Sequence, residues 1–151
     1  MADRCRGYLK ETTVDVFSKS KRSDVMSRIR GRDNRSTERK LAALLRAHGV
    51  AGWKLRTPDV IGRPDVYFPD WRIAVFIDGC FWHGCPRCFT MPAQNRPFWK
   101  SKIARNVERD RLVTTSLRKA GVMVLRLWEH DLERRTRRLR AALAKLKTAG
   151  P

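Results

Sequence analysis

Three cysteines stand close together in the middle of the chain and could hold a metal ion. Cys80, Cys85 and Cys88 fall within nine residues, spaced C-x4-C-x2-C, in a segment dense in Gly, Pro and aromatic residues. Such thiolates need one more nitrogen or sulfur ligand to complete a tetrahedral zinc site. Four protein ligands would leave no position for a substrate, so this zinc would stabilise the loop and any chemistry would lie elsewhere.

Spacing alone leaves the fourth zinc ligand open among His83, His130, His48 and Cys5. His130 follows the apolar segment 122–128, which is expected to be a strand. A residue just past that strand could reach the same sheet edge as the cysteine loop, so we favour His130. A disulfide framework is a weaker interpretation for a chain expected to act in a reducing cytosol.

Two carboxylates could form a second, catalytic metal site. Asp65 follows Gly-Arg-Pro at the start of an expected strand, and Asp78 ends the apolar segment 71–77. If those strands are neighbours, the two carboxylates meet at one sheet edge and suit Mg²⁺, which takes few protein ligands and keeps waters and phosphate oxygens. The alternative is that both are turn residues.

His83 lies five residues after Asp78, between two of the expected zinc ligands. A neutral imidazole held there could take a proton from an attacking water near pH 7. The pattern therefore predicts a Mg²⁺-dependent phosphodiesterase with His83 as the general base. Zinc ligation by His83 is the main alternative.

The charge of the chain indicates a polyanionic partner. Its 34 Lys and Arg against 15 Asp and Glu give a formal net charge of +19, distributed along the whole chain. Nucleic acid is the first candidate, ahead of a membrane surface. The sequence has no apolar stretch of the roughly 20 residues that a spanning helix needs, and its N-terminus lacks the apolar core of a signal peptide. We therefore expect a cytoplasmic protein.

Hydrophobic periodicity predicts the elements that position these residues. We expect a flexible basic arm over residues 1–18 and a single domain over residues 19–151. Helices are predicted over residues 20–30, 36–48, 96–119 and 131–147, and strands over residues 53–56, 66–68, 71–77 and 122–128. The fold class is α/β (mixed α+β), with a mixed central sheet flanked by helices.

Aromatic side chains near the cysteines suit insertion between base pairs on a basic protein. Phe81 and Trp82 lie between expected ligands, and Trp99 follows Phe98 at the start of the helix predicted over 96–119. Unstacking costs about a few kcal/mol per step and less at a mispair, so wedging itself favours damaged sites. We interpret Phe81 and Trp82 as facing DNA, and Phe98 as a core residue.

Over residues 20–139 the chain resembles the very-short-patch repair (Vsr) endonucleases. The motifs that carry the resemblance are Gly-Arg-Pro-Asp at 62–65, Asp-Gly-Cys-Phe-Trp-His-Gly-Cys-Pro-Arg-Cys at 78–88, Asn-Val-Glu-Arg-Asp at 106–110 and Trp-Glu-His at 128–130. The resemblance implies a restriction-endonuclease-like fold with a structural zinc loop. It also implies Mg²⁺-dependent nicking of duplex DNA 5′ of the thymine in T:G mismatches, which arise when 5-methylcytosine deaminates.

The resemblance also implies roles for individual catalytic residues. Asp65 would bind magnesium together with the backbone carbonyl near Ile77, and His83 would be the base. Glu38 looks like the acidic residue that the family places near the metal, and Asp110 like its outer carboxylate.

DNA-reading residues can be matched to the family in the same way. Phe81, Trp82 and Trp99 resemble the intercalating trio, Met26 the residue that enters from the other groove, and Asn106 the residue that contacts the mispaired base.

The implied zinc ligands are Cys80, Cys85, Cys88 and His130, with some departures from the family. Its best-known member carries His where Cys85 stands and Cys where His130 stands, an exchange that preserves a site of three sulfurs and one nitrogen. It also carries His at the position of Asp78. Whether Asp78 binds the metal or only orients a water is therefore open.

Two other functions compete with mismatch nicking: a noncatalytic zinc-stabilised DNA-binding module, and a restriction-type nuclease that cuts unmodified duplex. Asp65 and His83 favour an enzyme, since a binder needs neither. We expect a monomer in the bacterial cytosol, associated with the nucleoid. Mismatch-repair accessory proteins and a companion cytosine methyltransferase pathway are its expected partners, while the sequence context of the mismatch is not predicted.

Overall fold

A four-stranded mixed sheet flanked by helices forms the part of the chain, residues 35–149, that the computed structural model describes. The arm predicted over residues 1–18, the helix predicted over 20–30, Met26 and Cys5 lie outside these residues. The elements are, in order, α2 (Arg35–Ala47), β1 (Lys54–Leu55), β2 (Val66–Phe68), β3 (Ile73–Asp78), α3 (Arg96–Lys119), β4 (Met123–Trp128), α4 (Glu129–Arg134) and α5 (Arg137–Ala149). The predicted fold class is confirmed.

Strand pairing places the ends of the central strands at one edge of the sheet. The strand order is β1-β2-β3-β4, with β1 antiparallel to β2 and β2 antiparallel to β3. β4 runs parallel to β3, and Asp78 lies opposite Trp128. Since β2 runs the other way, Asp65, just before it, lies at this edge too.

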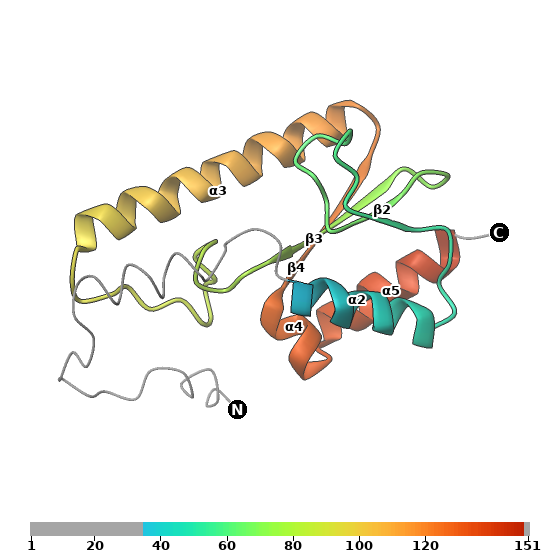
Figure 1. Cartoon of the computed structure of the whole chain (residues 1–151), viewed down its shortest axis with the longest axis horizontal. Coiled ribbons are helices and arrows are strands. Elements are labelled where there is room, and N and C mark those ends of the chain that lie inside the picture. The colour runs from blue at the N-terminus through green and yellow to red at the C-terminus, as the bar shows by residue number, and fades with distance from the viewer. Residues whose placement is uncertain (1–34, 150–151) are drawn as a thin grey trace.

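Helices cover both faces of the sheet. Figure 1 shows α2, α4 and α5 on one side of the strands and α3 on the other. The larger core joins α2, α4 and α5 to one sheet face, through Leu41, Leu45, Val66, Phe68, Ile73, Val75, Leu127, Leu132, Leu139, Leu143 and Leu146. The smaller core joins the C-terminal half of α3 to the other face, through Ala74, Phe76, Leu117 and Val122.

Several predicted elements are confirmed and others are shorter than predicted. The strand over residues 66–68 and the helix over 96–119 match in both bounds. β3 begins at Ile73, because Arg72 has a positive φ of 51° and lies in a turn. Within residues 35–149, none of the helices is long and apolar enough to cross a bilayer.

The prediction of one helix over residues 131–147 is wrong. The first helix, α4, ends at Arg134, because Arg135 takes a left-handed conformation with φ 47°. A second helix, α5, begins at Arg137. Thr136 caps α5, since its hydroxyl accepts from the Leu139 N–H (3.3 Å) and donates to Asp131 Oδ1 (2.7 Å). A threonine before an apolar period is an N-cap signal that the periodicity argument did not use.

We predict that Thr136→Val destabilises the protein by about 2 kcal/mol, because it removes the cap of α5 and a hydrogen bond to the buried carboxylate of Asp131. Urea denaturation of both proteins measures this change. Thr148→Val is the matched control, because the Thr148 hydroxyl donates only to carbonyls in the last turn of α5. Equal stability of Thr136→Val and the control would show that the cap contributes nothing.

Candidate active site and metal centre

The loop after β3 and the start of α4 bring three sulfurs around one imidazole nitrogen. The Sγ atoms of Cys80, Cys85 and Cys88 lie 3.2, 3.7 and 3.4 Å from His130 Nδ1, and all four atoms lie within 4.8 Å of one another. In a tetrahedral zinc site, bonds of about 2.3 Å to sulfur and about 2.0 Å to nitrogen separate those atoms by roughly 3.5 Å. The cluster therefore fits a metal ion with three thiolates and one imidazole.

The protonation of this cluster would change when a cation binds. Burial and the neighbouring thiol of Cys85 raise the pKa of Cys80 to about 11. Burial lowers the pKa of His130, and nearby arginine charges add to the effect, so its imidazole is neutral. Neutral imidazole is the ligand form of His, and a bound cation would displace the thiol protons.

Asp131 stands behind the ligand His130. Its carboxylate is 2% exposed, accepts from the Trp128 N–H (2.9 Å), and lies 3.6 Å from His130 Nε2. Carboxylates in this position orient ligand imidazoles in metal sites. Sequence reasoning missed Asp131, although an acidic residue directly after a candidate ligand is a usable signal.

The structure separates the candidate fourth ligands. His130 lies with the three cysteines, whereas His83 turns to α3 and contacts Asp110. His48 is exposed in the turn after α2.

Gly84 is a position of the cysteine loop that requires glycine. It has φ 64°, and a Cβ there would lie 3.0 Å from the Ile103 side chain, so the loop packs closely on α3.

His83 is held between two carboxylates. Its Nδ1 makes a short hydrogen bond to Asp110 Oδ2 and lies 3.7 Å from Asp78 Oδ1. Burial raises the pKa of Asp110, but the hydrogen bond from His83 and the charge of Arg126 outweigh it and lower that pKa below its ordinary value. Asp110 is therefore ionised and can accept the proton of Nδ1; in the tautomer that carries its proton there, Nε2 is the ring nitrogen that can accept one.

Asp78 is engaged by an arginine that sequence reasoning did not single out. Arg126 on β4 donates from Nε (2.8 Å) and NH2 (2.5 Å) to the two oxygens of Asp78, and its NH2 lies 3.1 Å from Asp110 Oδ1. Its guanidinium also lies over the Phe76 ring, 4.8 Å from the centroid. Although burial opposes it, the Asp78 contact raises the pKa of Arg126. The signal was one arginine in an otherwise apolar strand.

A second acidic group lies at the start of β2. Asp65 Oδ2 accepts from the Ile77 N–H (2.7 Å), and Glu38 of α2 accepts from Arg56 through Nε (3.1 Å) and NH2 (3.0 Å). Burial, with smaller contributions from the charges of Glu38 and Asp78, raises the pKa of Asp65 from 3.8 to about 6 in spite of the hydrogen bond from the Ile77 N–H, which lowers it. A cation near Asp65 would lower this pKa, because its positive charge stabilises the ionised carboxylate.

Aromatic rings gather beside the cysteine loop. Ring centroids lie 5.2 Å apart for Phe81 and Trp82, 5.2 Å for Phe81 and Trp99, and 6.0 Å for Trp82 and Trp99. Phe89, which sequence reasoning missed, joins them 5.7 Å from Phe81. The prediction that Phe98 is a core residue is wrong, because its side chain is 55% exposed.

Asn106 and Trp82 connect α3 to the loop. The Asn106 side-chain amide donates to the Trp82 carbonyl (2.8 Å), so one of its hydrogens is used within the protein. Its position beside the aromatic cluster follows from that bond.

Comparison with known proteins gives matches over most of the chain. The family described as DNA mismatch endonuclease Vsr matches residues 14–88. The DNA mismatch endonuclease Vsr of Escherichia coli (strain K12) is 40% identical over 124 residues, which cover 81% of this chain and 78% of that protein.

Two nicking enzymes are also similar. Type II nicking enzyme V.NmeAIP of Neisseria meningitidis serogroup A is 38% identical over 125 residues, 80% of this chain and 85% of that protein. Type II nicking enzyme V.NaeI of Lentzea aerocolonigenes is 54% identical over 69 residues, but the match spans only 42% of its length.

We predict that Asp65→Asn stabilises the protein near pH 7 by up to about 3 kcal/mol when no divalent cation is added. A folded-state pKa of about 6 against 3.8 means that the folded state holds the Asp65 proton more tightly. That stability is present below pH 3.8 and is lost as pH rises through 6, since one pKa unit corresponds to about 1.4 kcal/mol. An asparagine at this position cannot ionise, so the variant does not lose this stability at higher pH.

Urea denaturation at pH 4 and pH 7.5 measures the effect, which should appear only at the higher pH. Asp70→Asn, an exposed turn residue, is the control and should change stability by less than about 0.5 kcal/mol. An Asp65→Asn protein no more stable than wild type at pH 7.5 would contradict the prediction.

Proposed function

Because the chain belongs to the Vsr family of DNA mismatch endonucleases, we propose that it nicks duplex DNA 5′ of the thymine in T:G mismatches that arise from 5-methylcytosine deamination. The mixed sheet flanked by helices is the restriction-endonuclease-like fold of this family. The observation that carries the proposal is the pairing of His83 Nδ1 with ionised Asp110, which leaves Nε2 to act as a base.

In this proposal His83 takes a proton from the water that attacks the scissile phosphate. Asp110 keeps the imidazole in the tautomer that can accept a proton, and the cysteine loop holds it in place. In this proposal Asp78, the partner of Arg126, balances charge and is not a metal ligand, and the contact between the two side chains supports this role.

The proposed magnesium site consists of Asp65 and the backbone carbonyl of Ile77, with Glu38 nearby. The raised pKa of Asp65 supports this assignment, because a buried carboxyl beside other carboxylates favours a cation. When bound, Mg²⁺ would neutralise charge that develops on the phosphate. Arg56 holds Glu38 from the other side.

The remaining proposed contacts concern DNA. Phe81, Trp82 and Trp99 would wedge beside the mismatch, Asn106 would contact the mispaired base, and Met26, outside the described residues, would enter from the other groove. We propose that the protein acts as a monomer in the bacterial cytosol. Its lesions would come from a companion cytosine methyltransferase, and accessory mismatch-repair proteins would follow it.

The experiment that tests the activity uses purified protein, Mg²⁺ and a duplex with one T:G mispair. We expect a nick 5′ of the thymine, and a rate about 10²–10⁴-fold lower for His83→Ala, because general-base catalysis contributes about that factor. His48→Ala is the matched control, since His48 is exposed in the turn after α2 and belongs to neither cluster of candidate ligands. Gel analysis of the labelled strand measures the rate.

Two outcomes would overturn the activity. Intact binding without a nick would indicate a noncatalytic DNA-binding module. Equal cutting of the fully paired duplex would indicate a restriction-type nuclease.

We further propose that Cys80, Cys85, Cys88 and His130 hold a structural zinc. We expect one zinc per chain by elemental analysis, and a loss of zinc and of roughly several kcal/mol of stability in Cys85→Ala, because a structural zinc contributes folding free energy. Cys5→Ala and His83→Ala should keep the zinc. A full zinc content in Cys85→Ala, or its loss in His83→Ala, would refute this ligand set.

A further inference from the structure

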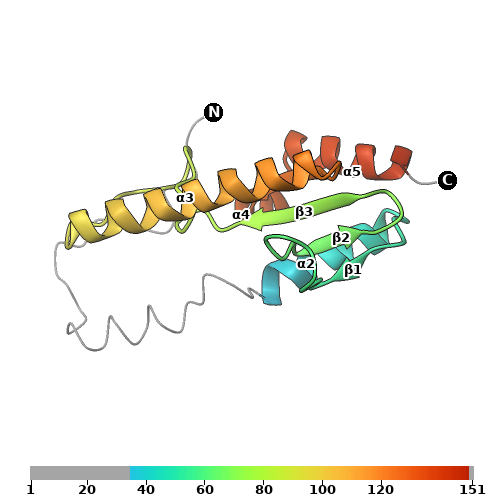
Figure 2. The ribbon, with the colours of Figure 1, turned by 90° about the horizontal axis from the view of Figure 1, so that it is seen from above.

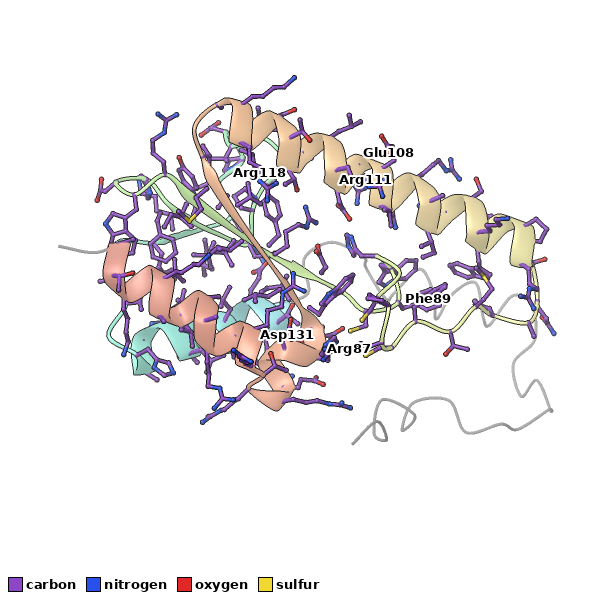
Figure 3. All side chains as sticks on the ribbon, turned by 180° about the vertical axis from the view of Figure 1, so that it is seen from behind. Arg87, Phe89, Glu108, Arg111, Arg118 and Asp131 are labelled. Carbon is purple, nitrogen blue, oxygen red and sulfur yellow. The ribbon has the colours of Figure 1, made fainter. Side chains whose placement is uncertain are left out.

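A cavity of about 480 Å³ lies between α3, β4 and the start of α5, directly beside the proposed catalytic base. His83, Asp78 and Asp110 lie at one end of its lining. The other charged and hydroxyl residues of the lining are Arg111, Thr114, Thr115, Arg118, Arg126 and Arg138. Figure 3 views the molecule from this side, with Arg111 and Arg118 along α3.

The lining of this cavity is positively charged. Four arginines face two aspartates, which leaves two positive charges when His83 is neutral. Arg126 is committed to Asp78, and Arg138 donates to the Arg126 carbonyl (2.8 Å). The two remaining arginines of the lining are Arg111 and Arg118.

Arg111 and Arg118 have no ion pair or hydrogen-bonding partner for their guanidinium groups among residues 35–149. They lie seven residues apart on α3, so they share a helix face and are separated by about 10 Å along its axis. Thr114 and Thr115 lie between them and offer hydroxyl donors. Two arginines with intervening hydroxyls suit an anion with several acceptor oxygens, and phosphate is the best match in geometry.

We propose that this cavity binds a backbone phosphate of the cleaved DNA strand, within about three phosphates of the scissile one. The position follows from Arg111, which is adjacent to Asp110, the partner of His83. Successive phosphates of one strand rise about 3.4 Å along the duplex axis and also wind around it, so a 10 Å stripe that begins at the base reaches at most about three phosphates from the scissile one. This inference rests on the proposed function, because it uses His83 to locate the scissile phosphate.

An acidic protein segment could also be attracted to two arginines, but the cavity favours DNA. Its lining includes the residues that would act on a phosphodiester, so a strand held for cleavage must pass its mouth. The contact would hold the strand in register without reading sequence.

The test measures binding of the whole protein to a T:G duplex without Mg²⁺, with a single neutral methylphosphonate moved along the cleaved strand. The variant is Arg111→Gln with Arg118→Gln. The matched control is Arg105→Gln with Lys119→Gln, which removes the same charge from exposed positions of α3 outside the cavity. Thermal denaturation checks that both variants fold.

We expect the cavity variant to bind the normal duplex at least about tenfold more weakly, with a salt slope shallower by about 1. One methylphosphonate position near the nick should weaken binding by wild type and by the control, and should have no effect on the cavity variant. Absence of such a position, or equal loss of this coupling in the control, would overturn the inference.

This readout is independent of the activity. A protein that fails to nick but shows the coupling would refute the proposed function and leave the phosphate site standing. A protein that nicks normally without any coupling would refute the phosphate site alone. Weakened binding of an acidic peptide by the cavity variant, with DNA binding unchanged, would also overturn it.

Discussion

The parallel pairing of β3 with β4 is the constraint on which the rest of the site depends. Because Asp78 lies opposite Trp128, the two strands end together. The chain that leaves β3 carries the cysteines, and the chain that leaves β4 carries His130, so ligands 42 residues apart in sequence meet at one edge. If β4 were shifted by one residue relative to β3, Arg126 would move to the other face of the sheet and away from Asp78. The positions of the Cys3His cluster and of His83 thus both follow from the pairing of β3 with β4.

The same pairing explains why Arg126 is tolerated in a strand with few polar residues. Its neighbours Leu125 and Leu127 pack against the larger core, while alternation turns Arg126 to the α3 side, over Phe76. A buried ion pair gives little net stability, since desolvation offsets the attraction, but it is costly to break. A cation at the cluster of Asp78, His83 and Asp110 would have to displace this guanidinium. That competition favours Asp65 as the metal ligand.

Sequence reasoning succeeded where a local pattern controls the outcome. The strand over residues 66–68 and the helix over 96–119 follow from apolar periodicity, and the cysteine spacing predicted a cluster that the structure assembles with His130. It failed where the outcome depends on a distant partner. No residue near Asp78 in the sequence indicates that Arg126 is its partner. The end of α4 at Arg135 depends on the hydrogen bond between Thr136 and buried Asp131, which apolar periodicity cannot predict.

The exposure of Phe98 has a geometric cause that also accounts for the arrangement of this end of α3. α3 has 24 residues and so spans about 36 Å, whereas β3 and β4 have six residues each and span about 20 Å. The N-terminal half of α3 must therefore run past the sheet, as Figure 2 shows. Among residues 35–149 the cysteine loop supports it, through the bond from Asn106 to Trp82 and the close approach of Gly84 to Ile103. The ring of Trp99 on this overhang packs against Phe81 and Trp82 of the loop instead of on the sheet, so the arrangement of the aromatic rings depends on the fold of the loop.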